Sequence, residues 1–293
     1  MKFRAVMVDT AAMRDFMNTV NSLSKLAKEC VIRIVERRVY FIISNEDAGP
    51  RKPFVWCELP VNFYFKQYNL TGVNEEHNEI YLAFATGMLA RSLSALKQNA
   101  RSLKIKLTNK QMPCLTLEIE LASSEGIEAR QLIHDVPVEV ISRQHWEDYA
   151  EPRFNDFHVS IQMPNLKPIK NIVERMKTMS NALIMSANKY GRLTLKIKTN
   201  MVTLSAHFPE LSVESFAVGH MPDDEEMEYE SEESDLQTVS ATIDIKKFLM
   251  FLTGMQVNNC KTTCSIVQSK MVKLALEQPG ALSFQCFLTE LSS

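Results

Sequence analysis

The feature that most constrains this chain is an order of secondary-structure signals that occurs twice. An extended segment, a helical apolar stripe, several β-prone runs, a second helix and three closing runs occupy residues 2–136, and the same order returns over 156–288. Corresponding helices lie about 155 residues apart, although the residues themselves barely match, and such spacing predicts a duplicated unit. We therefore expect an α+β fold made of two β-rich units with two helices each.

Four segments have apolar residues at helical spacing. In the first of them, Met13, Phe16, Val20 and Leu23 fall on one stripe, which is typical of an amphipathic helix. The second segment begins at Thr86, whose side chain is the expected N-cap. The predicted helices are 11–28, 86–101, 166–179 and 244–253.

Short runs rich in Val, Ile and Phe predict the strands. Within 102–108, Lys104 and Lys106 alternate with Leu103 and Ile105, which is the period of a half-buried strand. The strands expected in the first half are 2–8, 30–35, 39–44, 54–59, 64–70, 79–84, 102–108, 115–121 and 130–136. Those expected in the second half are 156–163, 182–188, 192–199, 202–208, 239–243, 262–267, 271–276 and 282–288.

These elements divide the chain into an N-terminal domain, 1–136, a connecting segment, 137–154, and a C-terminal domain, 155–293. Trp146 and Tyr149 either pack the connecting segment down or form an exposed docking site, and packing is favoured because large aromatic side chains usually pack. The aromatic residues between 63 and 68 pose a similar choice, between a base-stacking platform and hydrophobic core, with core favoured.

Charge is unevenly distributed along the chain. Residues 223–235 contain nine acidic residues and no basic one, so we expect a solvated, mobile loop. The formal net charge is −2, and without these nine residues it would be +7. The four predicted helices, in contrast, hold twelve basic and three acidic residues. This excess of one sign indicates a shared anionic target, with a chance excess of solvating lysines as the alternative.

No motif for catalysis or cofactor binding is found. The glycine-rich nucleotide motifs, H-E-x-x-H, G-x-S-x-G and the kinase signatures do not occur, and no two of the six histidines have metal-ligand spacing. Only Cys260 and Cys264 lie close together, so we expect reduced, buried thiols. We therefore expect no enzymatic activity, no metal and no cofactor. Apolar runs reach five residues, short of a membrane span of about 20, and no signal peptide is visible.

Several stretches resemble a known family, the Hus subunit of the nine-one-one checkpoint clamp, a relative of PCNA. The similarity runs from the first residue to the final strand, is most specific at 99–116 and is weakest at 209–238. The stretches are MKFRA at 1–5, KLAKEC at 25–30, WCEL at 56–59, NEIYL at 78–82, NARSLKIKLTNKQMPCLT at 99–116, HDVPVEVI at 134–141 and FLTGMQVN at 251–258.

The resemblance implies a non-enzymatic subunit of a heterotrimeric ring that encircles double-stranded DNA at damage sites. The implied partners are two other clamp subunits, an ATP-dependent clamp loader, repair enzymes and checkpoint kinase machinery, without membrane binding. The implied location is the nucleus, with a cytoplasmic pool before assembly. Helices line the hole of such rings, so the residues expected to contact DNA are Arg14, Lys25, Lys28, Arg91, Lys97, Lys167, Lys170, Lys177, Lys246 and Lys247.

The resemblance also implies that 130–136 and 202–208 are edge strands that pair with other subunits. Neither contains a lysine or proline, the residues that commonly protect an edge from pairing. The interface residues expected from it are Arg130, Leu132, Ile133, His134, Val202, Leu204, Ala206 and Phe208. Two alternatives remain open: a homotrimeric PCNA-type processivity clamp, for which the charge pattern would be the same, and a monomeric β-rich interaction scaffold or lipid-binding module.

Overall fold

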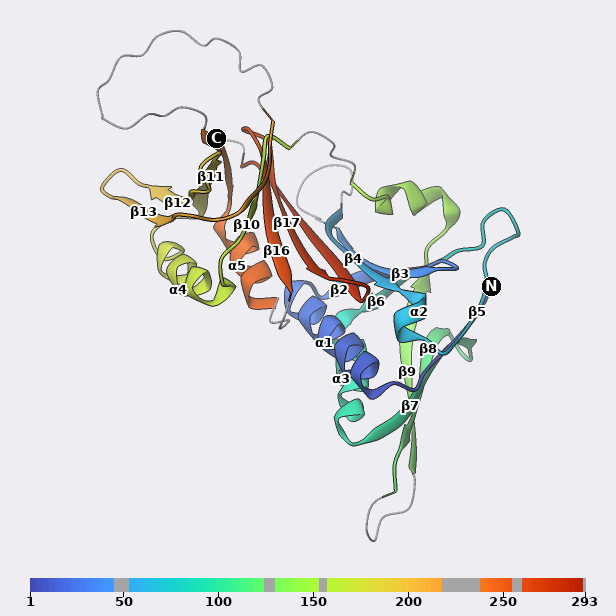
Figure 1. The fold of residues 1–293 in the computed structure, drawn as a ribbon. Coiled ribbons are helices and arrows are strands. Elements are labelled where there is room, and N and C mark those ends of the chain that lie inside the picture. The colour runs from blue at the N-terminus through green and yellow to red at the C-terminus, as the bar shows by residue number, and fades with distance from the viewer. Residues whose placement is uncertain (45–52, 124–129, 153–156, 218–237, 255–259, 292–293) are drawn as a thin grey trace. The chain divides into compact units, whose positions relative to one another are not determined.

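The structure is a computed structural model that describes residues 1–44, 53–123, 130–152, 157–217, 238–254 and 260–291 (Figure 1). It divides into two compact units. One comprises Met1–Pro152, Gly254–Asn259 and Glu277–Phe284, and the other comprises Arg153–Thr253, Cys260–Leu276 and Gln285–Ser293. The acidic segment 223–235 lies outside the described residues, so its predicted mobility stays a prediction.

The duplicated order of elements is present. The first copy consists of β1 (Lys2–Met7), α1 (Thr10–Leu26), β2 (Glu29–Ile34), β3 (Arg38–Ser44), β4 (Pro53–Pro60), α2 (Val61–Tyr64), β5 (Gln67–Thr71), β6 (Ile80–Ala85), α3 (Thr86–Leu93), η1 (Ser94–Lys97), β7 (Ala100–Asn109), β8 (Pro113–Leu121) and β9 (Arg130–Val140). The second consists of β10 (Val159–Gln162), α4 (Leu166–Met176), β11 (Ala182–Asn188), β12 (Leu193–Lys198), β13 (Thr203–Phe208), β14 (Val213–Phe216), β15 (Thr238–Asp244), α5 (Ile245–Gly254), β16 (Lys261–Val267), β17 (Met271–Gln278) and β18 (Leu282–Thr289).

Strand pairing repeats along with the order of elements. The first copy has strand orders β4-β3-β2-β6-β9 and β9-β8-β7-β1-β5, and the second has β13-β12-β11-β15 and β14-β10-β16-β17-β18. β9 belongs to two ladders, because Arg130–Pro137 pairs with β8 and Val138–Val140 pairs with β6. Each copy therefore repeats the same two runs of neighbouring strands, and β9 joins the two runs of the first copy.

The core of the first copy lies under α1, which packs against α3 (Figure 1). Asp9 caps α1, because its side-chain carboxylate accepts a hydrogen bond of 2.7 Å from the amide of Ala12. Phe16, on the buried side of the helix, has its ring 6.0–6.4 Å from the rings of Phe41, Tyr64 and Phe65. The aromatic residues after β4 are therefore mainly core, as predicted, while Phe63 beside them is 40% exposed.

The second helix is shorter than predicted. α3 ends at Leu93, continues as the short 3-10 helix η1, and gives way to β7 at Ala100. Asn99 adopts φ 58°, a left-handed conformation that asparagine tolerates and that ends a helix. Thr86 is not the N-cap, which is Ala85. The Thr86 hydroxyl is instead directed to carbonyls at the end of α1.

Other boundaries differ where the chain turns. The strand expected at 64–70 begins at Gln67, because Val61–Tyr64 forms the helical turn α2. β13 begins at Thr203, since Thr199 holds Val202 in the preceding turn. α4 ends at Met176 and not at 179. β14 has no counterpart in the prediction, because four half-buried or exposed residues give too short a pattern to recognise.

The connecting segment is packed down through its aromatic residues. The Trp146 ring stacks on Tyr81, with centroids 4.6 Å apart and an interplanar angle of 23°, and its indole N–H donates to the carbonyl of Ile141. Tyr149 is 5% exposed. The packing interpretation is thus confirmed over the docking alternative. β9 runs on to Val140, and Arg143–Tyr149 forms the 3-10 helix η2. Within the described parts of the chain, no helix has the length and apolar character needed to cross a membrane.

Candidate nucleic-acid interface and assembly edges

The solvent side of α1 presents a stripe without a carboxylate. Arg14 and Lys25 are exposed, and Asn18 and Asn21 lie between them at helical spacing on the same face. Lys28 is also exposed but lies beyond the end of α1, whose last residue is Leu26. This stripe has the composition that contact with phosphates requires.

The position of Lys28 is set by α3. Thr86 is 1% exposed; its amide donates to the Lys28 carbonyl at 2.9 Å, and its hydroxyl donates to the Ala27 and Lys28 carbonyls. Arg91 is exposed on α3, but its Nε donates to the Gly87 carbonyl at 3.2 Å. The start of α3 therefore fixes the backbone at the end of α1.

The other residues expected to contact DNA differ in their exposure and in whether an ion pair holds the side chain. Lys97, on η1, is exposed, as are Lys167 and Lys177 on and after α4. Lys170 is half-buried and its ammonium lies 3.7 Å from Glu174, one helical turn later.

The α5 lysines are tied to Asp244, whose Oδ1 accepts the amides of Lys246 at 2.7 Å and Lys247 at 3.4 Å. The Lys246 side chain is exposed. Lys247 is half-buried near Cys286, where its charge opposes the rise in the thiol pKa caused by burial. Exposure is the condition that DNA contact requires, and the contact itself stays a prediction for all ten residues.

β9 presents an edge. Arg130–Pro137 pairs with β8 on one side, and no described strand pairs with its other side. Ile133 is 59% exposed on this strand, while Leu132 and His134 are half-buried and Arg130 is exposed. An exposed isoleucine on an unpaired edge is a surface that another strand would cover.

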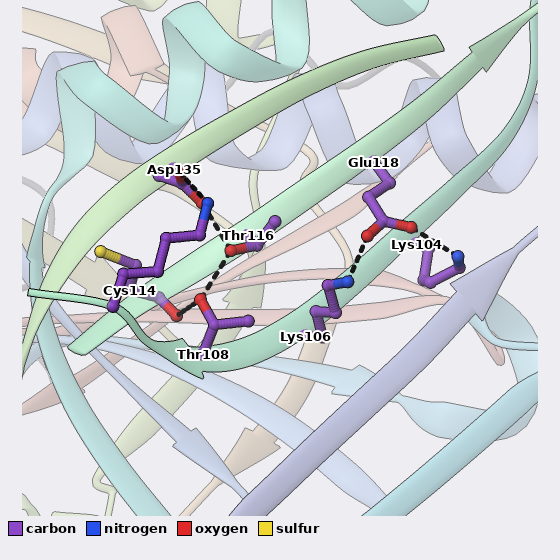
Figure 2. A network of polar contacts seen from close by, with 8 residues as sticks. Lys104, Lys106, Thr108, Cys114, Thr116, Glu118 and Asp135 are labelled. Carbon is purple, nitrogen blue, oxygen red and sulfur yellow. Dashed lines mark hydrogen bonds and ion pairs between the residues drawn. The ribbon is translucent and has the colours of Figure 1, made fainter. Parts of the chain in front are cut away.

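A polar network holds the β9 edge onto its sheet (Figure 2). The Asp135 carboxylate accepts hydrogen bonds from Lys110 Nζ and the Thr116 hydroxyl, each at 2.6 Å, and these bonds lower the pKa of Asp135. Thr116 in turn lies 2.7 Å from the hydroxyl of Thr108. The network spans β7, β8 and β9, so the predicted interface strand is fixed in register.

A second carboxylate lies beside this network. Glu118 on β8 is 8% exposed and contacts both Lys104 and Lys106 of β7, as Figure 2 shows. Hydrogen bonds from Lys104 and Lys106 lower the pKa of Glu118, and the bond from Lys104 has the larger effect. The sequence showed the alternation in β7 but not this pairing, which depends on the β7–β8 register.

β13 is the other predicted edge, and it ends its sheet. Leu204, Ala206 and Phe208 are half-buried, and they alternate with exposed Thr203, Ser205 and His207. Val202, just before the strand, is 50% exposed, and Met201 in the same turn is 94% exposed. The sequence did not single out Met201, because a lone exposed methionine gives no periodic signal. Assembly through β9 and β13 stays a prediction.

The fold defined by these elements is that of the sliding clamps. The crystal structure of proliferating cellular nuclear antigen from Entamoeba histolytica aligns with a TM-score of 0.71, covering 99% of both chains at 12% identity. Such a similarity establishes the fold of this chain.

Sequence comparison is more specific. The family described as "Hus1-like protein" matches residues 1–292, and this chain belongs to that family. It is 41% identical to Checkpoint protein HUS1 of Homo sapiens over the full length of both, and 28% identical to Checkpoint protein Hus1-like of Drosophila melanogaster over 94% of each. Fold and family together identify a checkpoint clamp subunit, as the sequence predicted.

Proposed function

We propose that this chain is one of three different subunits of a ring that encircles double-stranded DNA at damage sites and supports checkpoint kinase activation and DNA repair. The observation that supports the ring best is the pair of unlike edges, β9 and β13. Two different edges on one chain favour head-to-tail contacts, and such contacts close into a ring when the rotation fits. Half-buried Leu204 and Phe208 and exposed Ile133 favour covered edges over the monomeric scaffold.

DNA would pass along the basic faces of the helices without base-specific contacts. A ring that slides needs attraction to phosphates but no contact with base edges, and lysine and arginine supply this. Arg14, Lys25 and Lys177, which are exposed and show no ion pair within the described residues, are the strongest candidates.

We infer that the subunit has no catalytic role. Burial raises the pKa of Cys30, Cys57 and Cys286 well above the ordinary value, and that of Cys264 to about 12, so these thiols do not supply a thiolate nucleophile. Among the described residues, no group of three or more His, Cys, Asp or Glu side chains could hold a metal ion. Retention by enclosure needs no chemistry in the subunit.

The proposed partners follow from this role. Two other clamp subunits complete the ring, an ATP-dependent loader opens it, and repair enzymes and checkpoint kinase machinery act from it. The proposed location is the nucleus, where the DNA is, with a cytoplasmic pool before assembly.

Two measurements test the proposal. Native mass spectrometry is applied to the chain alone and after recovery from nuclear extract, and two different partners at one copy each are expected. A stable homotrimer of the chain alone would favour a processivity clamp instead. The assembled ring, once loaded, should remain on a closed circular plasmid and should slide off when the plasmid is linearised. Equal retention on linear and circular DNA would contradict encirclement.

A further inference from the structure

β5 is a further uncovered edge, away from the two predicted assembly strands. It pairs with β1 on one side, and no described strand lies on the other (Figure 1). Its sequence, Gln67 to Thr71, contains no charged residue and no proline. Such an edge offers unpaired N–H and C=O groups to an added strand.

Two cations lie on β1, the strand that pairs with β5. In the β1–β5 register Lys2 is opposite Thr71 and Arg4 is opposite Asn69, so Lys2 and Arg4 share one face of the sheet. Both side chains are exposed, and neither forms an ion pair with a described residue. The next cation across the sheet, Lys106, is neutralised by Glu118. The charges of Lys2 and Arg4 are therefore available to a ligand.

The same residues line an open groove of about 970 Å³. Its walls include Lys2, Arg4 and Lys106 together with residues 69–71 of β5, and Glu36 is its acidic residue. A second groove, of about 930 Å³, shares Glu36 with the first and leads to Arg37, which is exposed and forms no ion pair with a described residue. Among the residues that line these two grooves, cations thus outnumber carboxylates.

We propose that this groove binds an extended acidic peptide of a partner protein, which adds to β5 as a further strand. Alternate residues of a strand lie about 6.6 Å apart on one face, and Lys2 and Arg4 have this same two-residue spacing. A peptide with acidic residues at every second position therefore matches them. A nucleic acid has no backbone amides to pair with β5, and its continuous phosphates would meet Glu36.

The test uses the full-length chain and a fluorescein-labelled peptide of about ten residues in which Thr and Glu alternate. Fluorescence anisotropy should show binding that weakens about tenfold or more when Gln replaces every Glu, because the charge complementarity is removed. Peptides N-methylated at alternate residues, in either register, keep the charge but have fewer backbone donors. At least one register should fail to bind, and equal binding of both would overturn strand addition.

Charge reversal locates the site. Lys2→Glu with Arg4→Glu should weaken the Thr–Glu peptide about tenfold or more, whereas Lys198→Glu with Lys270→Glu, at exposed positions in the second copy, should not. Circular dichroism checks that both double variants remain folded. Equal binding by the Lys2/Arg4 variant would overturn the proposal. So would a single-stranded oligonucleotide that displaces the peptide and depends on Lys2 and Arg4 to the same degree, since the site would then belong to nucleic acid.

Discussion

The hydroxyl of Thr86, at the start of α3, donates to the main-chain carbonyl of Ala27, just past the end of α1. The same hydroxyl lies 3.0 Å from the carbonyl of Lys28. Thr86 is 1% exposed, so its hydroxyl is shielded from water. One side chain thus joins α3 to the end of α1 and fixes the backbone of a predicted DNA contact.

Replacing Thr86 by Val should therefore destabilise the protein by about 1 kcal/mol, the usual net contribution of a hydrogen bond, because the bond to the Ala27 carbonyl is lost. Thr86→Ser keeps the hydroxyl and serves as the matched control. Urea unfolding followed by circular dichroism measures the difference. Equal stability of the Val and Ser variants would show that the hydroxyl contributes nothing to joining the helices.

Removing exposed cations on and just after the helices should change DNA binding but not folding. Replacing Arg14, Lys25, Lys28 and Lys177 by Ala should reduce the slope of log affinity against log salt by about 0.9 for each phosphate that is no longer neutralised. The assembled ring is the sample. Arg192, Lys198 and Lys270, exposed on strands and turns, are the control set. Stability should change by about 0.5 kcal/mol or less per site. An unchanged slope would mean that these residues do not face DNA.

Substitutions on the β9 edge should impair assembly with other subunits but leave the folding of the isolated chain unchanged. Ile133 is 59% exposed, so Ile133→Asp should leave the isolated chain folded while a charge replaces the apolar contact with a neighbouring subunit. Ile133→Pro also removes a main-chain donor. Native mass spectrometry of co-expressed subunits is expected to show loss of the ring for both variants. Normal assembly of a folded Ile133→Asp chain would place this edge in solvent.

Acid should weaken the sheet through Glu118. Its folded-state pKa lies below the ordinary value of 4.5, so the group stabilises the fold above that value and loses this contribution as pH falls through the lowered pKa. The melting temperature of the wild-type chain should therefore fall more steeply between about pH 5 and pH 3 than that of Glu118→Gln. Glu120→Gln, an exposed carboxylate on the same strand, is the control. Parallel curves for wild type and Glu118→Gln would contradict the assignment.

The sequence predicted most elements because their signals are local. The stripe through Met13, Phe16 and Val20 and the alternation through Leu103 and Ile105 need no tertiary information. The turn into β7 depends on a left-handed conformation at Asn99, which composition does not reveal. β14 was missed because its four residues have no periodic pattern.

The site residues also divide into those that a local pattern predicts and those that depend on strand pairing. Exposed cations such as Arg14 and Lys25 could be predicted, because a helical stripe indicates which face is solvated. The hydrogen bond from Lys110 to Asp135 could not be predicted, because the two residues come close only through the pairing of β8 and β9. The free charges of Lys2 and Arg4 beside β5 likewise became visible only with the register of β1.

Because most of the cysteines are buried, the rate at which their thiols react can report local unfolding of this chain. Cys30, Cys57, Cys114, Cys264 and Cys286 are buried, whereas Cys260 is partly accessible. A maleimide dye should therefore attach to the native protein first at Cys260, which provides one defined position for fluorescence measurements. The other five thiols become reactive only as the strands that hold them open, so the rate at which they are labelled reports local opening of each half without any engineered probe.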